Sequence, residues 1–188
     1  MNLILSVPLE VRLALVFLLG ACLGGAANWA IYRLAWNPRP ISPWSRPDAA
    51  APPRRFADRL PILGWLGLRR EAALHGPGFW LRPMLLELLA GCGLAALYWW
   101  EVGAGGLLPA GIVGPLSPGV QAILHLQFTA HCILIGLMLA ASMIDVDEKT
   151  IPDEITVVGT LVGLLLATAL PWSLLPDGIV AGRIAPDF

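Results

Sequence analysis

The stretch Asp145-Val-Asp-Glu-Lys-Thr-Ile-Pro-Asp-Glu154 separates two long apolar runs, and the expected fold follows from what lies on either side of it. This acidic turn contains five of the thirteen Asp and Glu residues of the chain. Carboxylates are costly near hydrocarbon, and those that are kept there usually face a bundle interior, water or a substrate. We therefore expect the acidic turn to be a polar connection between two membrane-spanning helices.

The composition predicts an all-α membrane protein. Of the 188 residues, 57% are hydrophobic and only 13% are charged, whereas a soluble domain carries about 25% charged residues. About four transmembrane helices are expected, since a span needs about 20 apolar residues. The four apolar runs cover residues 13–31, 84–100, 120–144 and 155–175. Residues 1–101 form one region, made of the first helix, a loop over residues 36–83 and the second helix, and residues 120–188 form another.

The distribution of basic residues predicts the orientation. Nine of the twelve Lys and Arg residues lie between Arg33 and Arg82, and the 103–119 loop has none. Basic residues concentrate on the cytoplasmic side of a membrane. We therefore expect the Arg- and Pro-rich loop to be cytoplasmic and the N-terminus to be outside. Three crossings then bring the acidic turn to the cytoplasmic side as well.

The residues of the acidic turn allow three interpretations. In the first, they form a solvated turn, with Asp153 near the N-cap of the next helix. In the second, Asp145, Asp147 and Glu148 bind a hard cation, although their spacing matches no EF-hand. In the third, they form an acid–base site. Asp145 directly follows the apolar run that ends at Ile144, so we expect its carboxyl group to be half desolvated and suited to proton exchange.

For the polar residues inside the apolar runs, a structural role is preferred to a functional one. Asn28 and Glu87 are expected to hydrogen-bond across the bundle, or else to contact the backbone of a substrate. His125 and His131 are expected to be satisfied within or between helices. Cys22, Cys92 and Cys132 lie in separate runs without metal-ligand spacing, and they are interpreted as packing residues. No metal and no cofactor is predicted, and no nucleic acid is expected as a partner.

Four further features concern the loop and the first helix. The proline-rich first half of the loop is expected to be extended and mobile. The apolar patch Leu60–Leu68 is expected to lie against the membrane, with Trp44, Trp65 and Trp80 as interfacial anchors. His75 is expected to be solvated. Small residues of the first helix are expected to let another helix approach closely, as a substrate helix would: Gly20, Ala21, Gly24, Gly25, Ala26 and Ala27.

Three stretches, taken in order along the chain, resemble the prepilin peptidase family, also called type IV leader peptidases. The first active-site motif of the family is similar to Ile144-Asp145 followed, after five intervening residues, by Ile151-Pro152-Asp153. Gly24–Asn28, followed by Tyr32-Arg33-Leu34, is similar to its first-helix signature. The third stretch is similar to its cytoplasmic loop and the start of its second helix, and it comprises Arg59–Leu68, Arg69, Arg82-Pro83 and Glu87-Leu88-Leu89.

The resemblance implies a membrane-embedded aspartyl endopeptidase of the bacterial inner membrane. It would cleave leader peptides of type IV prepilins or type II secretion pseudopilins at the cytoplasmic face. Asp145 would be the first catalytic aspartate, and Asp153, Asn28 and Glu87 would have supporting or substrate-binding roles. The expected partners are the prepilin or pseudopilin substrate and the lipid bilayer. Residues 120–188 would begin the peptidase domain.

The chain departs from the family pattern in two ways. Many family members carry two CxxC pairs in the cytoplasmic loop, whereas this loop has no cysteine, so the N-methyltransferase activity of part of the family is not assigned. The second catalytic aspartate of the family lies in a later GxGD motif, which does not occur in these 188 residues. The chain is therefore expected to be an N-terminal portion or a degenerate member. The alternatives are a catalytically inactive membrane scaffold of the same fold and a cation-binding transport fragment.

Overall fold

A computed structural model describes residues 7–108 and 116–170, and within them it is helical, without strands. Four long helices are present: α2 (Leu9–Leu34), α5 (Leu81–Tyr98), α6 (Pro118–Glu148) and α7 (Asp153–Ala169). The loop between α2 and α5 contains the short elements η1 (Phe56–Arg59), α3 (Leu63–Leu68), η2 (Arg69–Glu71) and α4 (Ala72–His75). The all-α prediction is confirmed.

Three helices of the described chain are long and apolar enough to cross a membrane: Leu9–Leu34, Leu81–Gly103, which includes the π-helical turn η3 (Trp99–Gly103), and Pro118–Glu148. The predicted fourth span is also a helix, but α7 has only 17 residues. Its expected end at Leu175 lies outside the described residues. The predicted cores of the first three spans lie within these helices, each of which extends a few residues further at both ends.

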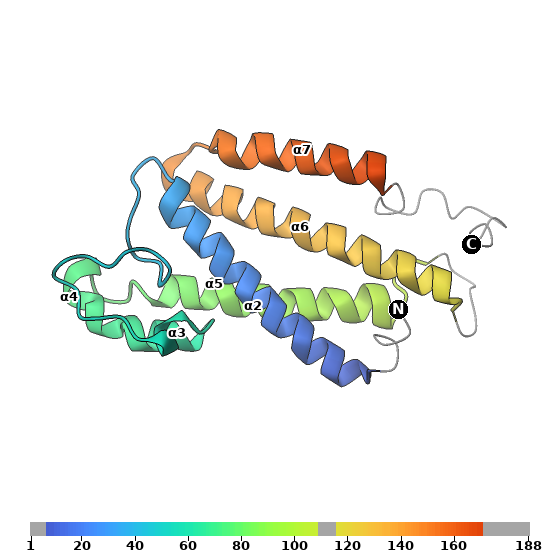
Figure 1. Cartoon of the computed structure of the whole chain (residues 1–188), viewed down its shortest axis with the longest axis horizontal. Helices are drawn as coiled ribbons and strands as arrows, with labels where there is room; N and C mark the ends of the chain where they lie inside the picture. Colours follow the sequence, from blue (N-terminus) through green and yellow to red (C-terminus); the bar gives the residue numbers. More distant parts are fainter. Residues whose placement is uncertain (1–6, 109–115, 171–188) are drawn as a thin grey trace.

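Helices α2 and α5 form the tightest pair, and α2 crosses α5 in Figure 1. Two glycines of α2 permit the approach. A Cβ atom on Gly20 would lie 2.7 Å from the carbonyl oxygen of Ala90, and one on Gly24 would lie 2.7 Å from the Cα atom of Glu87. The predicted small-residue face is therefore confirmed as a helix-packing surface. Its proposed use for a substrate helix is wrong at these two glycines, because α5 already occupies it.

The larger core cluster lies at the end of the bundle that carries the loop. Tyr32 of α2, Trp65 and Leu68 of α3, Ile144 of α6 and Ile155 of α7 are all buried in it. A smaller cluster toward the other end contains Leu94, Tyr98 and Phe128. Figure 1 shows the acidic turn between α6 and α7 at the same end of the bundle as the loop. The predicted proximity of these two stretches is thus present in the fold.

Several expectations about the loop are wrong. Trp65 is only 1% exposed and is a core residue, whereas Trp44 is 59% exposed. The proline-rich segment does not extend away, because Ile41 and Ser42 are buried against the rest of the chain. The side chain of His75 is 11% exposed and its ring packs on Phe79, so His75 is not a solvated residue. Each difference has the same cause: the loop folds back and packs against itself and against the helices of the bundle.

Candidate functional site

The acidic turn is shaped by the end of one helix and the start of the next. Lys149 ends α6 in the left-handed conformation, with φ 58°, and its N–H donates to the carbonyl oxygen of Asp145 at 2.8 Å. Pro152 precedes α7, and Asp153 and Glu154 lie in the first turn of that helix. Acidic side chains are favourable there because the N-terminus of a helix carries a partial positive charge. The helix start predicted near Asp153 is therefore present.

Two carboxylates of the turn bind neighbouring segments. Both carboxylate oxygens of Asp147 accept hydrogen bonds from Arg82 Nη1 at 2.9 Å, which ties the turn to the start of α5. Glu148 accepts from the backbone N–H groups of Trp36 and Asn37, where the chain leaves α2. The ion pair of Asp147 with Arg82 is partly exposed, and exposed pairs contribute little to stability. These contacts position the turn more than they stabilise it.

Asp145 and Asp153 are the two acids of the turn that the resemblance implicates in catalysis. Both are exposed, and neither side chain has a hydrogen-bond or ion-pair partner within residues 7–108 and 116–170. The expected half-burial of Asp145 is therefore not present in these helices. Within the described residues, no second carboxylate pairs with Asp145 either. Its carboxylate is therefore accessible from outside the bundle.

Asn28 and Glu87 meet in the interior, as the first of their two interpretations predicts. Asn28 Nδ2 donates to Glu87 Oε1 at 3.2 Å and to the carbonyl oxygen of Pro83 at 2.9 Å. Glu87 Oε1 also accepts from Trp65 Nε1 at 2.8 Å, and its Oε2 accepts from the N–H of Ile62 at 2.6 Å. Glu87 is 3% exposed. It therefore joins α2, α5 and the loop, and among the described residues it forms no hydrogen bond or ion pair with the acidic turn.

The contact with Ile62 has a conformational consequence. Ile62 has φ 65° and ψ −61°, a region that a β-branched residue rarely adopts. The N–H of the next residue, Leu63, donates to the carbonyl oxygen of Pro61 at 2.6 Å, which closes a three-residue turn around Ile62. Because Glu87 accepts the N–H of Ile62, the carboxylate helps to hold this turn where α3 begins.

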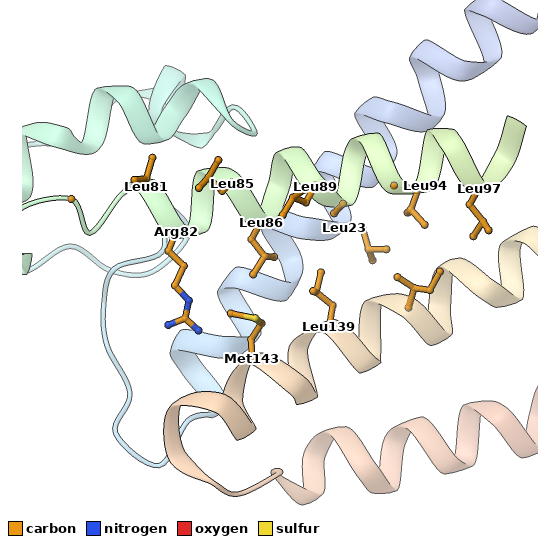
Figure 2. Close-up of a pocket in the computed structure, with 14 residues that line it drawn as sticks. Leu23, Leu81, Arg82, Leu85, Leu86, Leu89, Leu94, Leu97, Leu139 and Met143 are labelled. Atoms are coloured by element: carbon orange, nitrogen blue, oxygen red, sulfur yellow. The ribbon is translucent and has the colours of Figure 1, made fainter. Parts of the chain in front are cut away.

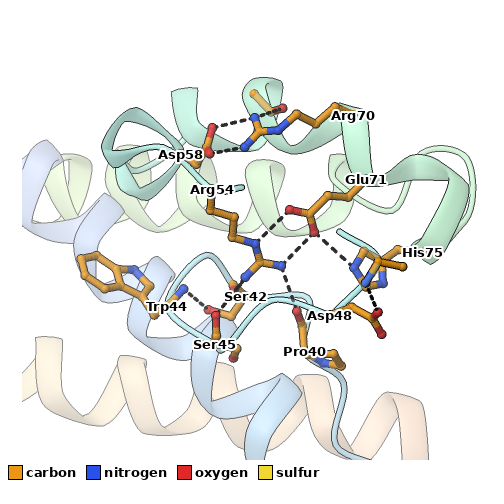
Figure 3. Close-up of polar contacts among 12 residues, drawn as sticks. Pro40, Ser42, Trp44, Ser45, Asp48, Arg54, Asp58, Arg70, Glu71 and His75 are labelled. Carbon is orange, nitrogen blue, oxygen red and sulfur yellow. Dashed lines mark hydrogen bonds and ion pairs between the residues drawn. The ribbon is translucent and has the colours of Figure 1, made fainter. Parts of the chain in front are cut away.

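The loop is closed by buried ion pairs, which Figure 3 shows. Arg54 donates to both carboxylate oxygens of Glu71, at 2.9 and 2.8 Å, and the two side chains are 5% and 0% exposed. Arg54 also donates to the backbone carbonyl oxygens of Pro40, Ser42 and Ser45. One guanidinium group thereby fastens the proline-rich segment to η2. We call this arrangement the Arg54 clamp.

A second ion pair closes the opposite side of the loop. Arg70 binds both carboxylate oxygens of Asp58, and the N–H of Arg55 donates to Asp58 Oδ2 at 2.6 Å. The hydrogen bond from Arg70 is the main reason that the pKa of Asp58 lies below its ordinary value. Burial alone would raise the pKa of Glu71, but the hydrogen bonds and charges of Arg54 and His75 together outweigh burial and lower it. Both carboxylates are thus held in the charged form.

The histidines of α6 have hydrogen-bond partners within or between helices, as predicted. His125 Nδ1 lies 2.7 Å from the carbonyl oxygen of Gln121, and its Nε2 lies 3.1 Å from the hydroxyl group of Tyr98. His131 Nδ1 lies 2.6 Å from Oε1 of Glu101, a residue that is 1% exposed. Among the described residues, no group of three or more His, Cys, Asp or Glu side chains is arranged to hold a metal ion.

An apolar cavity of about 700 Å³ lies between α5 and α6. Figure 2 shows leucines of α5 along one side and Leu139 and Met143 of α6 along the other, with Leu23 of α2 between them. Arg82 lines one end, where it also binds Asp147. The cavity therefore runs from the interior of the bundle to the edge of the acidic turn.

Residues 132–185 of the chain match the Type IV leader peptidase family. This match contains the whole acidic turn. The chain is related to the prepilin peptidase family. The resemblance drawn from the three sequence stretches is thereby confirmed, and the spanning helices together with the family indicate a membrane protein.

Three curated relatives carry the name prepilin leader peptidase/N-methyltransferase. The protein of Myxococcus xanthus is 26% identical over 90% of this chain and 44% of its own length. That of Dickeya chrysanthemi is 29% identical over 87% of this chain and 66% of its own length. That of Pseudomonas putida is 26% identical over 89% and 58%. The chain thus spans about half the length of these relatives, and no solved structure matches it significantly.

The loop network was the part of the site that sequence reasoning missed. Arg54 and Arg70 were counted only among the basic residues that predict the cytoplasmic side, and no role was predicted for Asp58 and Glu71. Their spacing of 17 and 12 residues within an irregular segment follows no helical or strand period. Since pairs of this kind are made by tertiary folding, no local pattern in the sequence indicated them.

Proposed function

We propose that this chain supplies the first catalytic aspartate, Asp145, of a membrane-embedded aspartyl endopeptidase. The substrate class is the type IV prepilins or type II secretion pseudopilins, whose leader peptides would be cleaved at the cytoplasmic face of the bacterial inner membrane. The single observation that carries the proposal is the placement of Asp145. It lies at the end of a spanning helix, inside the family match, with a carboxylate that the described residues leave exposed.

In an aspartyl protease two carboxylates share one proton, so that one activates water while the other polarises the scissile carbonyl. Asp145 would provide one of these carboxylates. The second has to be brought to it by a segment outside the described residues. Asp153, in the first turn of α7, would support the site by adding negative charge next to Asp145, which favours a basic leader peptide.

The neighbouring contacts of the turn support this assignment. Arg82 and the amides of Trp36 and Asn37 engage Asp147 and Glu148, so these two acids hold the turn in place while Asp145 stays available. Asn28 and Glu87 use their polar atoms to join helices. We therefore propose a positioning role for them, through the loop that they anchor, in place of direct contact with substrate.

Replacement of the carboxylate tests the proposal. The gene product would be co-expressed in full with a pilin-like substrate that has a basic leader, and leader cleavage would be followed by gel mobility and by N-terminal sequencing. Asp145→Asn is expected to abolish cleavage, because an amide cannot exchange the proton. Glu154→Gln is the matched control, since Glu154 is an exposed acid of the same turn, and it is expected to cleave normally. Normal cleavage by Asp145→Asn would end the proposal.

A catalytically inactive membrane scaffold of the same fold is the alternative. The observation that favours it is that, among the described residues, no carboxyl group forms a hydrogen bond or ion pair with Asp145. Under this alternative, the wild-type protein would leave the leader intact while still binding the substrate. Co-purification of uncleaved pilin with both the wild type and Asp145→Asn would support the scaffold.

A further inference from the structure

A second cavity, of about 390 Å³, lies where the loop covers one side of α2. Cys22, Ala26 and Trp29 of α2 form one wall, and Trp44, Arg59 and Trp65 of the loop form the other. It is separate from the apolar cavity between α5 and α6, because the two share no lining residue. It also contains no residue of the acidic turn, so the proposed cleavage site does not explain it.

The cavity changes in character along the axis of α2. Arg33 follows Cys22 by eleven residues, which corresponds to about 16 Å along a helix. The deep end, at Cys22 and Ala26, therefore lies at hydrocarbon depth if α2 spans the membrane. The other end carries the exposed residues Trp29, Trp44 and Arg59, and tryptophan and arginine are typical of a membrane–water interface. A ligand that fills the cavity would have an apolar part and a polar part.

The polar end is positively charged. The guanidinium group of Arg59 lies 5.5 Å from the ring centre of Trp44, and that of Arg33 lies 5.7 Å from the ring centre of Trp29. Within residues 7–108 and 116–170, neither arginine has a carboxylate partner. Stacking on an aromatic ring orients a guanidinium group but leaves its N–H donors free for an anion.

Glu87 is the acidic residue of the lining, and both of its carboxylate oxygens already accept hydrogen bonds from the protein. Its two oxygens accept hydrogen bonds from Asn28, Trp65 and the N–H of Ile62. The carboxylate is 3% exposed at the floor of the cavity. The available charge is therefore that of Arg59, which lines the cavity, and of Arg33, which stacks on the lining residue Trp29, and it selects an anion.

We propose that this cavity binds an anionic phospholipid of the cytoplasmic leaflet. One acyl chain lies along Cys22 and Ala26, and the phosphate group binds Arg59 and Arg33 between the two tryptophans. The charge of the rim argues against a basic leader peptide as the occupant, because like charges repel. Arginines beside a spanning helix attract anionic lipid electrostatically. The bound lipid would join the loop to α2 without taking part in peptide cleavage.

The experiment measures lipid binding directly. The purified protein in detergent is titrated with phosphatidylglycerol or phosphatidylcholine, and bound lipid is counted by native mass spectrometry. Phosphatidylglycerol is expected to bind at one saturable site, and the double variant Arg33→Gln/Arg59→Gln is expected to weaken it about tenfold or more. The double variant Arg39→Gln/Arg46→Gln removes the same charge from exposed loop positions outside the cavity, and it is expected to bind as the wild type does.

Two results would overturn the proposal. One is equal binding of phosphatidylcholine and phosphatidylglycerol, and the other is an equal loss of binding in the two double variants, which would indicate a diffuse effect of charge.

A second experiment tests whether an acyl chain occupies the deep end of the cavity. Cys22 and Cys92 are both exposed, and only Cys22 lines the cavity. Phosphatidylglycerol is expected to slow maleimide alkylation of Cys22 relative to Cys92, and unchanged relative rates would contradict acyl-chain binding there.

Discussion

The Arg- and Pro-rich loop and the acidic turn lie at one end of the same bundle, and they differ in how their carboxylates are used. In the loop and beneath it, Asp58, Glu71 and Glu87 are each at most 3% exposed, and each accepts several hydrogen bonds. In the turn, Asp145 and Asp153 are exposed and have no side-chain partner among the described residues. A buried, saturated carboxylate has no capacity left for chemistry, whereas an exposed and unpaired one does. The comparison therefore separates the acids that hold the fold from those that are free to act.

The largest expected effect comes from breaking the Arg54 clamp. Arg54→Met should destabilise the folded loop by about 4 kcal/mol, because it leaves the buried carboxylate of Glu71 without a partner and removes the donors to three carbonyl groups. Hydrogen exchange of the backbone amides of residues 40–75 measures this loss. Arg55→Met, at the neighbouring exposed position, should change protection little. Equal protection in Arg54→Met and the wild type would show that the clamp does not hold the loop.

The next largest effect is expected at Glu87. Glu87→Ala should lower the free energy of unfolding by about 3 kcal/mol, because the buried N–H groups of Trp65 and Ile62 lose their acceptor. Thermal unfolding in detergent, followed by circular dichroism, gives the difference. Glu154→Ala removes an exposed acid of the turn and should stay within about 0.5 kcal/mol of the wild type. Similar losses in the two variants would erase the distinction between the two regions.

Acid should weaken the loop. The pKa values of Asp58 and Glu71 are lowered in the folded protein, so their stabilising contribution is complete above the ordinary carboxyl pKa of about 4. It is lost as the pH falls through the lower pKa values of the folded state. Hydrogen exchange across the loop at a series of pH values tests the sign. Glu71→Gln should flatten this acid dependence, and an unchanged slope would contradict the assignment.

The smallest effect is expected in the turn. Lys149 has φ 58° and ψ 28° at the end of α6, a conformation that glycine adopts without strain. Lys149→Gly should therefore stabilise the protein by about 0.5 kcal/mol. The same change at Thr150, which does not have a positive φ, should be destabilising. Thermal unfolding of the two variants compares them, and a loss of stability in Lys149→Gly would mean that the lysine side chain makes a contribution of its own.

Much of the fold was predictable because it depends on local patterns. Uncharged runs predicted the spanning helices, and Pro152-Asp153 predicted the start of α7. The motif around Asp145 predicted the family that the comparisons then showed. Asn28 and Glu87 were predicted to hydrogen-bond across the bundle because isolated polar groups in apolar helices need partners, and the structure shows that they bind each other. The roles of Asp145 and Asp153 remain predictions, since they concern chemistry that the helices alone do not display.

The errors share one origin. Trp65, His75 and the proline-rich segment were assigned to the surface because they lie in a loop rich in arginine. In the structure, Glu87 binds Trp65, Glu71 lies beside His75, and Arg54 binds the carbonyl groups of the proline-rich segment. These partners are 4 to 22 residues away in the sequence. Side-chain pairing over such separations depends on how the chain folds back on itself.

The sequence by itself determined that this chain is helical, enters a membrane and carries an acidic turn of the prepilin peptidase type, because hydropathy, charge asymmetry and a local motif are properties of contiguous residues. Only the tertiary structure decided which carboxylates have hydrogen-bond or ion-pair partners. Burial and hydrogen bonding are set by groups that meet across helices and loops, so Glu71 and Glu87 became structural residues while Asp145 kept an open carboxylate.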